Sequence, residues 1–322
     1  MDRLTARDPQ FVAELRAQVR GDLREREGLA RYSTYRIGGP ATVLLPAGAE
    51  DVAAALRVAA AASVPWFALG LGSNLLLPDA GLEALVIRLG KGMDQLVRED
   101  GGTRWRIGAG LPAPLAARRT ADIGLAGLHR FVGVPGTVGG GVYMNAGCHG
   151  GDWSEVVQQV TVVTSAGEDR VLARREIPFT YRRSGLDSQV VVETVVELHP
   201  EDPVRLQADV AELFRWRQEG TPFNQPCCGS VFKNPGGPSW ERREGPRTAG
   251  QLIEAAGLKG YRIGGAEISP MHANYFVNTG GATAADVRAL IAHAQRVVED
   301  KFGVHLEPEV KLIGPRGEYQ HG

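Results

Sequence analysis

Apolar residues in the first two hundred positions occur mainly in short runs that are typical of β-strands. Residues 9–28 carry many charges with single apolar residues between them, which predicts a charged, peripheral helix. Residues 50–62 are rich in alanine and begin with Glu50 and Asp51, acidic residues that suit a helix N-terminus. The predicted strands are Ala41–Leu45, Trp66–Leu69, Leu85–Leu89, Trp105–Ala109, Val156–Thr164, Arg170–Leu172 and Val190–Leu198.

Helical spacing dominates the last third of the chain. Residues 203–217 place apolar side chains at helical intervals. The segments Thr248–Gln251 and Thr283–Asp286 have the capping-box pattern, which predicts two more helix starts. Gly257 and Gly303 mark where these helices should end.

The chain has 322 residues, enough for two domains. The change from strands to helices at His199–Pro203 places the main boundary near residue 202. A formal net charge of −1, without a clustered basic face, argues against nucleic-acid binding. The 42 glycines occur in clusters, which indicates tight turns or close approach of the backbone to a ligand.

Neither a signal peptide nor a membrane-spanning segment is predicted. The longest apolar stretch, Val52–Val64, is interrupted by Arg57 and is too short to cross a bilayer. Cys148, Cys227 and Cys228 are an odd number of cysteines, two of them adjacent, which does not suit a disulfide framework. We therefore expect a cytoplasmic protein.

Two glycine-rich segments follow or precede predicted strands. Gly70–Asn74 follows an apolar strand, and Gly133–Gly141 contains five glycines in nine residues. Such segments allow backbone N–H groups to face an anion with no Cβ in the way. Tight turns also need glycine, so composition alone leaves a phosphate-bearing ligand and ordinary turns equally open.

A third segment, Gly108–Ala113, fits the dinucleotide fingerprint G-x-G-x-x-A. The acidic residue that this fingerprint requires about 20 positions later is missing, because the chain reads Leu128-His129-Arg130 there. Neither glycine segment contains the Gly-Lys-Ser/Thr of a phosphate-binding P-loop. Both nucleotide-binding folds are thus disfavoured.

Seven motifs occur along the chain, and together they span roughly residues 31–314. They are Tyr35–Ala41, Gly70–Asn74, Gly133–Gly147, Tyr181–Ser184, Gly229–Pro235, Gly264–Asn278 and Leu306–Val310. In this order they resemble the motifs of the UDP-N-acetylenolpyruvoylglucosamine reductases, bacterial flavoenzymes of cell-wall synthesis, and a match of seven ordered motifs is highly specific.

The resemblance implies an α+β fold. A vanillyl-alcohol-oxidase/PCMH-type FAD-binding domain of two subdomains would cover residues 31–202, and a smaller α+β substrate-binding domain residues 203–314. Residues 1–30 would form a helical extension and 315–322 a tail. Only 48 positions separate Arg182 from Ser230 (230 − 182), which resembles the family's second type.

The resemblance also implies non-covalently bound FAD, with NADPH as co-substrate. His129 precedes the second glycine segment, but the family does not tether its flavin through histidine. The residues implied to bind FAD are Leu71, Gly72, Ser73, Asn74, Gly133, Pro135, Gly136, Thr137, Gly139, Asn145 and Gly147.

Three residues would carry out the implied reduction of the enolpyruvyl group. Arg182 would hold the substrate carboxylate through two charge-assisted bonds, because its guanidinium is a rigid fork. Ser230 would be the general acid. Glu309 would assist at the carboxylate and is expected to be protonated in the working complex or to share a proton with the substrate. On residue pattern alone, a surface arginine, a turn serine and a surface glutamate are the ordinary alternatives.

Arg217, Lys233 and Asn234 would bind the substrate's diphosphate, although a solvated lysine is the ordinary alternative. Glu307 is predicted to be a bystander. His272 is expected to be a packed, hydrogen-bonded histidine.

The vicinal pair Cys227-Cys228 departs from the family pattern, and its spacing does not favour a redox role. No His or Cys spacing indicates a metal site. The expected partners are UDP-N-acetylglucosamine enolpyruvate and NADPH, with no nucleic acid and no membrane. A monomer is expected, although the sequence does not fix the oligomeric state.

Two other functions remain open. Another FAD-dependent oxidase or dehydrogenase of the same fold would bind FAD and not respond to the enolpyruvyl sugar nucleotide. A non-enzymatic flavin or sugar-nucleotide binder would not turn over NADPH. The presence of Arg182, Ser230 and Glu309 together argues against both.

Overall fold

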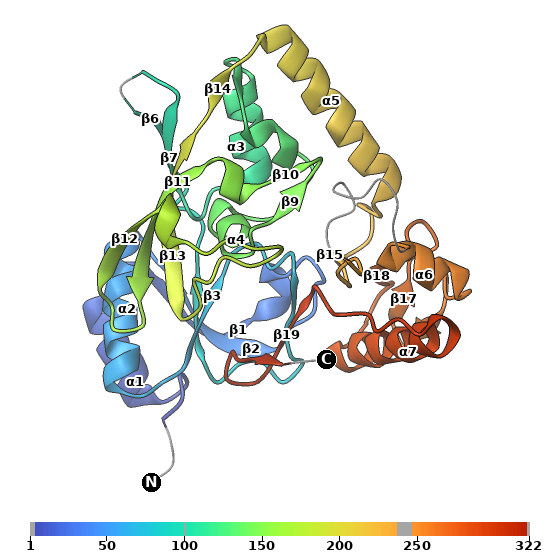
Figure 1. Cartoon of the computed structure of the whole chain (residues 1–322). Helices are drawn as coiled ribbons and strands as arrows, with labels where there is room; N and C mark the ends of the chain where they lie inside the picture. Colours follow the sequence, from blue (N-terminus) through green and yellow to red (C-terminus); the bar gives the residue numbers. More distant parts are fainter. Residues whose placement is uncertain (1–3, 100, 237–246, 321–322) are drawn as a thin grey trace. The chain divides into compact units, whose positions relative to one another are not determined.

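The computed structural model describes residues 4–99, 101–236 and 247–320 of the chain (Figure 1). The chain divides into two compact units. Unit 1 comprises the described residues up to 27, 41–71 and 83–215, and unit 2 comprises 28–40, 72–82 and the described residues from 216 on. This division differs from a single boundary near residue 202, because two N-terminal segments cluster with the C-terminal part.

The first sheet of unit 1 has four strands in the order β1-β2-β5-β3. Strands β2, β5 and β3 are parallel. Helix α1 buries Phe11 and Leu15 in the same core as Leu56 of α2. The prediction of one peripheral helix over residues 9–28 is therefore wrong: α1 ends at Gln18, and the following residues pair with β2. The elements are α1 (Pro9–Gln18), β1 (Asp22–Gly28), β2 (Pro40–Leu45), α2 (Ala49–Ala61), β3 (Trp66–Leu69) and β5 (Leu85–Arg88).

The second sheet of unit 1 is antiparallel, with the strand order β12-β11-β13-β7-β6. Its hairpin turn at Ser165–Glu168 is confirmed, and Gly167 there has φ +77°. Helix α3 (Ala113–Ala121) follows β7, but the antiparallel pairing of β7 excludes a Rossmann unit at Gly108–Ala113, as the missing carboxylate predicted. The strands are β6 (Leu96–Arg98), β7 (Arg104–Gly108), β11 (Val157–Thr164), β12 (Asp169–Ala173) and β13 (Gln189–Glu197).

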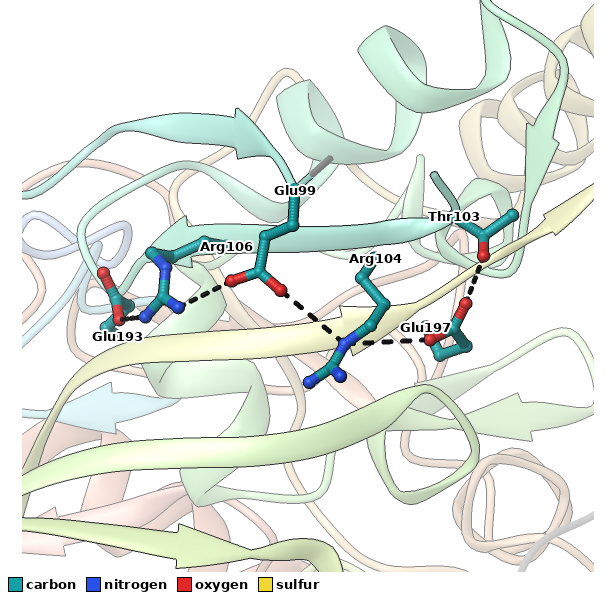
Figure 2. A network of polar contacts seen from close by, with 6 residues as sticks. All are labelled: Glu99, Thr103, Arg104, Arg106, Glu193 and Glu197. Carbon is teal, nitrogen blue, oxygen red and sulfur yellow. Dashed lines mark hydrogen bonds and ion pairs between the residues drawn. The ribbon is translucent and has the colours of Figure 1, made fainter. Parts of the chain in front are cut away.

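A network of charged side chains crosses strands β6, β7 and β13 of this sheet (Figure 2). Arg106 bonds Glu193 at 2.5 Å and Glu99 at 2.6 Å. Arg104 lies 3.6 Å from Glu99 and 3.9 Å from Glu197. Bonds to both carboxylates raise the pKa of Arg106. The network connects the edge strand β6 to the interior of the sheet.

Unit 2 contains an antiparallel sheet in the order β15-β18-β17-β16. Both predicted capping boxes are confirmed, at Thr248 before α6 and at Thr283 before α7. Asp79 also accepts the N–H of Ala284 at 2.8 Å, which connects the segment 72–82 to α7. The elements are β15 (Cys227–Ser230), α6 (Ala249–Ala255), β16 (Arg262–Ile263), β17 (Ala266–Ile268), β18 (Tyr275–Asn278) and α7 (Ala284–Phe302).

Helix α5 (Pro203–Gly220) begins in unit 1 and ends in unit 2. None of the helices in the described part of the chain combines the length and apolar character needed to cross a bilayer. The remaining helices and strands are η1 (Leu29–Tyr32), β4 (Leu75–Leu76), α3 (Ala113–Ala121), β8 (Leu125–Ala126), η2 (Leu128–Phe131), α4 (Val138–Tyr143), β9 (Gly147–Cys148), β10 (Gly151–Asp152), η3 (Trp153–Glu155), η4 (Arg174–Glu176), β14 (His199–Pro200), β19 (Lys311–Ile313) and β20 (Tyr319–Gln320).

Candidate active site

The first glycine segment, Gly70–Asn74, follows β3 and contains a turn that requires glycine. Gly72 has φ +62°, and a Cβ at this position would lie 2.3 Å from the carbonyl oxygen of Tyr32. The Gly72 carbonyl accepts the N–H and the hydroxyl of Thr34, each at 3.3 Å. The backbone of this segment is thus held close to the backbone at Tyr32–Thr34, which leaves no room for a side chain at Gly72.

The second glycine segment, Gly133–Gly147, is only partly a loop, because α4 lies inside it. Gly136 has φ +150°, and the hydroxyl of Thr137 caps α4 by accepting an N–H at 3.3 Å. A Cβ at Gly141 would lie 2.4 Å from Nε1 of Trp153. Glycine therefore allows the backbone of α4 to pack directly on neighbouring groups.

Gly70, the first residue of the first glycine segment, meets the second segment within unit 1. A Cβ at Gly70 would lie 2.6 Å from Oγ1 of Thr137. Ala113 donates its N–H to the carbonyl of Gly136 at 2.9 Å, so the third glycine-rich segment joins them. Glycine backbone without obstructing Cβ atoms, next to a hydroxyl, fits the diphosphate of a dinucleotide cofactor. The predicted FAD residues lie in or directly beside these two segments.

Arg182 lies in unit 1, in the tight turn Thr180–Arg183, which two backbone hydrogen bonds of 2.8 and 3.1 Å close. Its φ is +60°, a left-handed conformation that is uncommon outside glycine. The guanidinium donates to the carbonyl of Gly147 at 3.0 Å and stacks over the Tyr181 ring, 4.9 Å from its centroid. The predicted carboxylate-binding arginine is thus tied to the end of the second glycine segment.

Ser230 and Glu309 lie in unit 2 and are held by a shared set of bonds. Ser230 ends β15 and pairs with Tyr275 of β18. Glu309 donates its N–H to the carbonyl of Val231 at 2.7 Å, and its own carbonyl accepts Nδ2 of Asn74 at 3.1 Å. The backbone of Glu309 therefore joins Val231, the residue after Ser230, to Asn74 at the end of the first glycine segment.

The three residues predicted to hold a diphosphate also lie in unit 2. Nζ of Lys233 forms an ion pair with Glu307 at 2.5 Å, and the side-chain oxygen of Asn234 accepts the N–H of Ala249 at 3.1 Å. Arg217 lies over the ring of Tyr275, 5.8 Å from its centroid. Glu307, predicted to be a bystander, is 66% exposed and is the partner of Lys233 in this ion pair.

The vicinal cysteines are both free thiols. Burial raises the pKa of Cys227 and of Cys228, with Gly229 and Arg217 partly opposing the shift at Cys227. Burial also raises the pKa of Tyr35, whose hydroxyl neighbours Cys228. Because a thiolate is the reactive form of cysteine, raised pKa values disfavour a redox role for the pair.

The two histidines that the sequence singled out serve as acceptors of local bonds. Nδ1 of His129 accepts the N–H of Gly127 at 3.1 Å, and Nδ1 of His272 accepts the N–H of Asn274 at 3.1 Å. Burial lowers the pKa of both rings, with a nearby arginine adding to the effect. His272 is confirmed as a packed, hydrogen-bonded residue.

Sequence reasoning missed the residues that support the site. Asp152 accepts Nδ2 of Asn145, and the carbonyl of Thr180 accepts it too. Tyr35, which neighbours Cys228, lies in the motif Tyr35–Ala41, whose sequence does not indicate a role for it. The bond from Asn145 to Thr180 and the proximity of Tyr35 to Cys228 join segments that are distant in sequence, so no local signal could have revealed them.

Comparisons with known proteins agree with this geometry. Residues 40–172 match the model of an FAD-binding domain, and residues 221–313 match the C-terminal domain of UDP-N-acetylenolpyruvoylglucosamine reductase. A reductase of this name from Halalkalibacterium halodurans is 42% identical over 95% of this chain and 99% of its own length. Another, from Bacillus anthracis, is 41% identical with the same coverage.

Solved structures point the same way. The crystal structure of the reductase from Thermus caldophilus superposes with a TM-score of 0.75 and 34% identity, covering 90% of this chain and 99% of that one. An alkyldihydroxyacetonephosphate synthase shares the fold alone, with a TM-score of 0.50 and 20% identity over 62% of this chain and 43% of its own.

The fold and the paired glycine segments define a flavin oxidoreductase with a vanillyl-alcohol-oxidase/PCMH-type FAD-binding domain and a further α+β part. The predicted fold class is therefore confirmed. Within that class, the chain belongs to the UDP-N-acetylenolpyruvoylglucosamine reductase family.

Proposed function

We propose that this protein reduces the enolpyruvyl group of UDP-N-acetylglucosamine enolpyruvate to form UDP-N-acetylmuramate, a precursor of peptidoglycan. FAD is the cofactor and NADPH the reductant. The observation that carries the proposal is that the Glu309 backbone bonds both Val231, next to Ser230, and Asn74 in unit 2, because this holds the two proposed catalytic residues beside a predicted cofactor segment. The near-full-length similarity to reductases of this name supports it.

The reductant, the cellular location and the oligomeric state are part of the same proposal. NADPH is proposed as the reductant from family membership, since no separate motif for it is visible in the sequence. A cytoplasmic location and a monomeric state are proposed in the same way.

When bound, FAD would deliver a hydride to the terminal vinyl carbon of the substrate. Negative charge then develops on the carbon beside the carboxylate, as an enediolate-like species. Arg182 is proposed to bind that carboxylate, and well-aimed donors at developing charge contribute about 10²- to 10³-fold in rate. Its bond to Gly147 and its stacking on Tyr181 orient the guanidinium before the substrate arrives.

Ser230 is proposed to donate the proton that completes the reduction. A hydroxyl is a weak acid, but an enediolate-like species is basic enough to accept its proton, and such donors contribute about 10²- to 10⁴-fold. Glu309 is proposed to share a proton with the substrate carboxylate, because two ionised carboxylates in contact would repel each other.

Arg217, Lys233 and Asn234 are proposed to bind the diphosphate. The ion pair between Lys233 and Glu307 then has to open or to accommodate the ligand. The amide nitrogen of Asn234 is the group proposed to face the diphosphate, because its oxygen caps α6.

Rapid-reaction kinetics of Ser230→Ala test the proposal. NADPH should reduce the flavin at the normal rate, whereas reoxidation by the enolpyruvyl substrate should slow by about 10²- to 10⁴-fold. Cys227→Ser, a change in the same strand, is the control and should leave both steps unchanged. Slow flavin reduction by NADPH in Ser230→Ala, with normal reoxidation, would contradict the assigned role.

A further inference from the structure

The amide nitrogen and the amide oxygen of Asn145 are both engaged in hydrogen bonds within the protein. Asn145 is 2% exposed. Its Nδ2 donates to Oδ2 of Asp152 and to the carbonyl of Thr180, each at 3.0 Å. Its Oδ1 accepts the N–H of Ser154 at 3.1 Å. An amide nitrogen has two hydrogens, so both donors of Asn145 are used without a ligand.

One of these partners is the turn that carries Arg182. The carbonyl of Thr180 accepts Asn145, and Thr180 also forms both backbone bonds that close the turn with Arg183. The Arg182 guanidinium in turn donates to the carbonyl of Gly147, two residues after Asn145. The segment 145–147 therefore holds this turn at its backbone and at its arginine side chain.

Both ends of this connection have strained backbones. Asn145 has φ +42° and Arg182 has φ +60°, in the left-handed region that disfavours residues with a Cβ. Such conformations persist where surrounding contacts determine them, and they often occur at functional sites. Gly147 completes the arrangement, because a Cβ there would lie 3.1 Å from the guanidinium and 2.8 Å from the carbonyl of Gly151.

We infer that Asn145 is a positioning residue for Arg182, oriented by Asp152, and that its side chain does not contact the cofactor. This inference rests on the proposed function for its catalytic consequence. Asn145 is among the residues expected to bind FAD, and the inference limits that contact to its backbone. Its role is to fix the turn in the strained conformation that presents the arginine to a substrate carboxylate.

Asn145→Gly is the informative variant, because glycine adopts positive φ without strain and only the side-chain bonds are lost. Flavin reduction by NADPH and the Kd for FAD should be unchanged. Reoxidation by the enolpyruvyl substrate should slow by about 10- to 100-fold, the range expected from lost buried hydrogen bonds. The same change in an Arg182→Ala background should add little, since coupled residues are not additive.

Arg183→Ala is the matched control, since this side chain lies in the same turn and is 72% exposed. It should leave both steps unchanged. A raised Kd for FAD in Asn145→Gly, with normal rates at saturating FAD, would overturn the inference. If Asn145→Gly slowed reoxidation equally in the wild-type and in the Arg182→Ala background, the inference that Asn145 acts by positioning Arg182 would be overturned.

Hydrogen exchange of the apoprotein tests the positioning without any activity. The amide of Arg183, bonded to Thr180 at 3.1 Å, should exchange at least tenfold faster in Asn145→Gly. Unchanged exchange would overturn the inference. If the wild-type protein failed to reduce the substrate, the proposed function would fall, and this exchange measurement would still decide whether Asn145 holds the turn.

Discussion

Replacing Gly72 by alanine tests whether the first glycine segment is shaped for a cofactor. Two costs can be worked out from the structure. A left-handed alanine costs about 1–2 kcal/mol relative to glycine. In addition, the new Cβ would lie 2.3 Å from the carbonyl oxygen of Tyr32 and 2.9 Å from Cα of Ser33. These are backbone atoms that have to shift, at a further cost of about 1–3 kcal/mol.

Gly101→Ala separates the two costs. Gly101 has φ +66°, close to the value at Gly72, and a Cβ there would meet no atom within 4 Å. The control therefore carries only the conformational cost. The difference between the variants in the free energy of unfolding measures the clash with the chain at Tyr32.

Titration of each apoprotein with FAD, followed by flavin fluorescence, is the assay. Gly72→Ala should raise the Kd for FAD at least tenfold, because about 1.4 kcal/mol of distortion at the binding segment is enough for that change. Gly101→Ala should leave the Kd unaltered. Equal Kd values for the two variants would refute the assignment of Gly72 to the cofactor segment.

Three further predictions concern single groups. If Glu309 shares a proton with the substrate, Glu309→Gln should keep most of the reoxidation rate and Glu309→Ala should lose it; equal activity in both would remove any role for the side chain. Because burial raises the pKa of Cys227 and Cys228, thiol labelling of the native protein should be slow at pH 7 and accelerate as the pH rises, whereas fast labelling at pH 7 would contradict the burial. Arg106→Gln should lower the free energy of unfolding by about 1 kcal/mol at low salt, as partly exposed ion pairs do, and by less in 1 M salt; a loss that does not depend on salt would contradict an electrostatic origin.

Local patterns predicted most of the regular elements. Strands such as Trp66–Leu69 are continuous apolar runs, and the helices after Thr248 and Thr283 begin with capping boxes. These signals work because apolar runs and capping boxes depend on neighbouring residues only.

Elements that depend on distant partners could not be predicted in this way. Residues 22–28 read as charged helix and form a strand, because they pair with β2. Helix α4 lies in a glycine-rich segment, although each glycine in a helix costs about 1 kcal/mol relative to alanine. Close packing explains it: a Cβ at Gly139 would lie 2.7 Å from that of Ala109.

The division of the chain into units was beyond sequence reasoning for the same reason. Segment 72–82 is early in the chain, and it belongs to unit 2 through contacts such as Asp79 with the start of α7. For the site residues, too, the sequence identified the residues and not their contacts. Motifs identified Lys233 and Asn145, but only the structure shows that Lys233 forms an ion pair with Glu307 and that Asn145 bonds Thr180.

The most direct test of the proposed function is the visible spectrum of the purified protein under anaerobic conditions, recorded during two additions. NADPH should bleach the flavin bands, and UDP-N-acetylglucosamine enolpyruvate should then restore them. Bleaching without recovery would contradict the proposed substrate. Absence of flavin bands even after FAD is added would contradict the assignment of the glycine segments to a flavin.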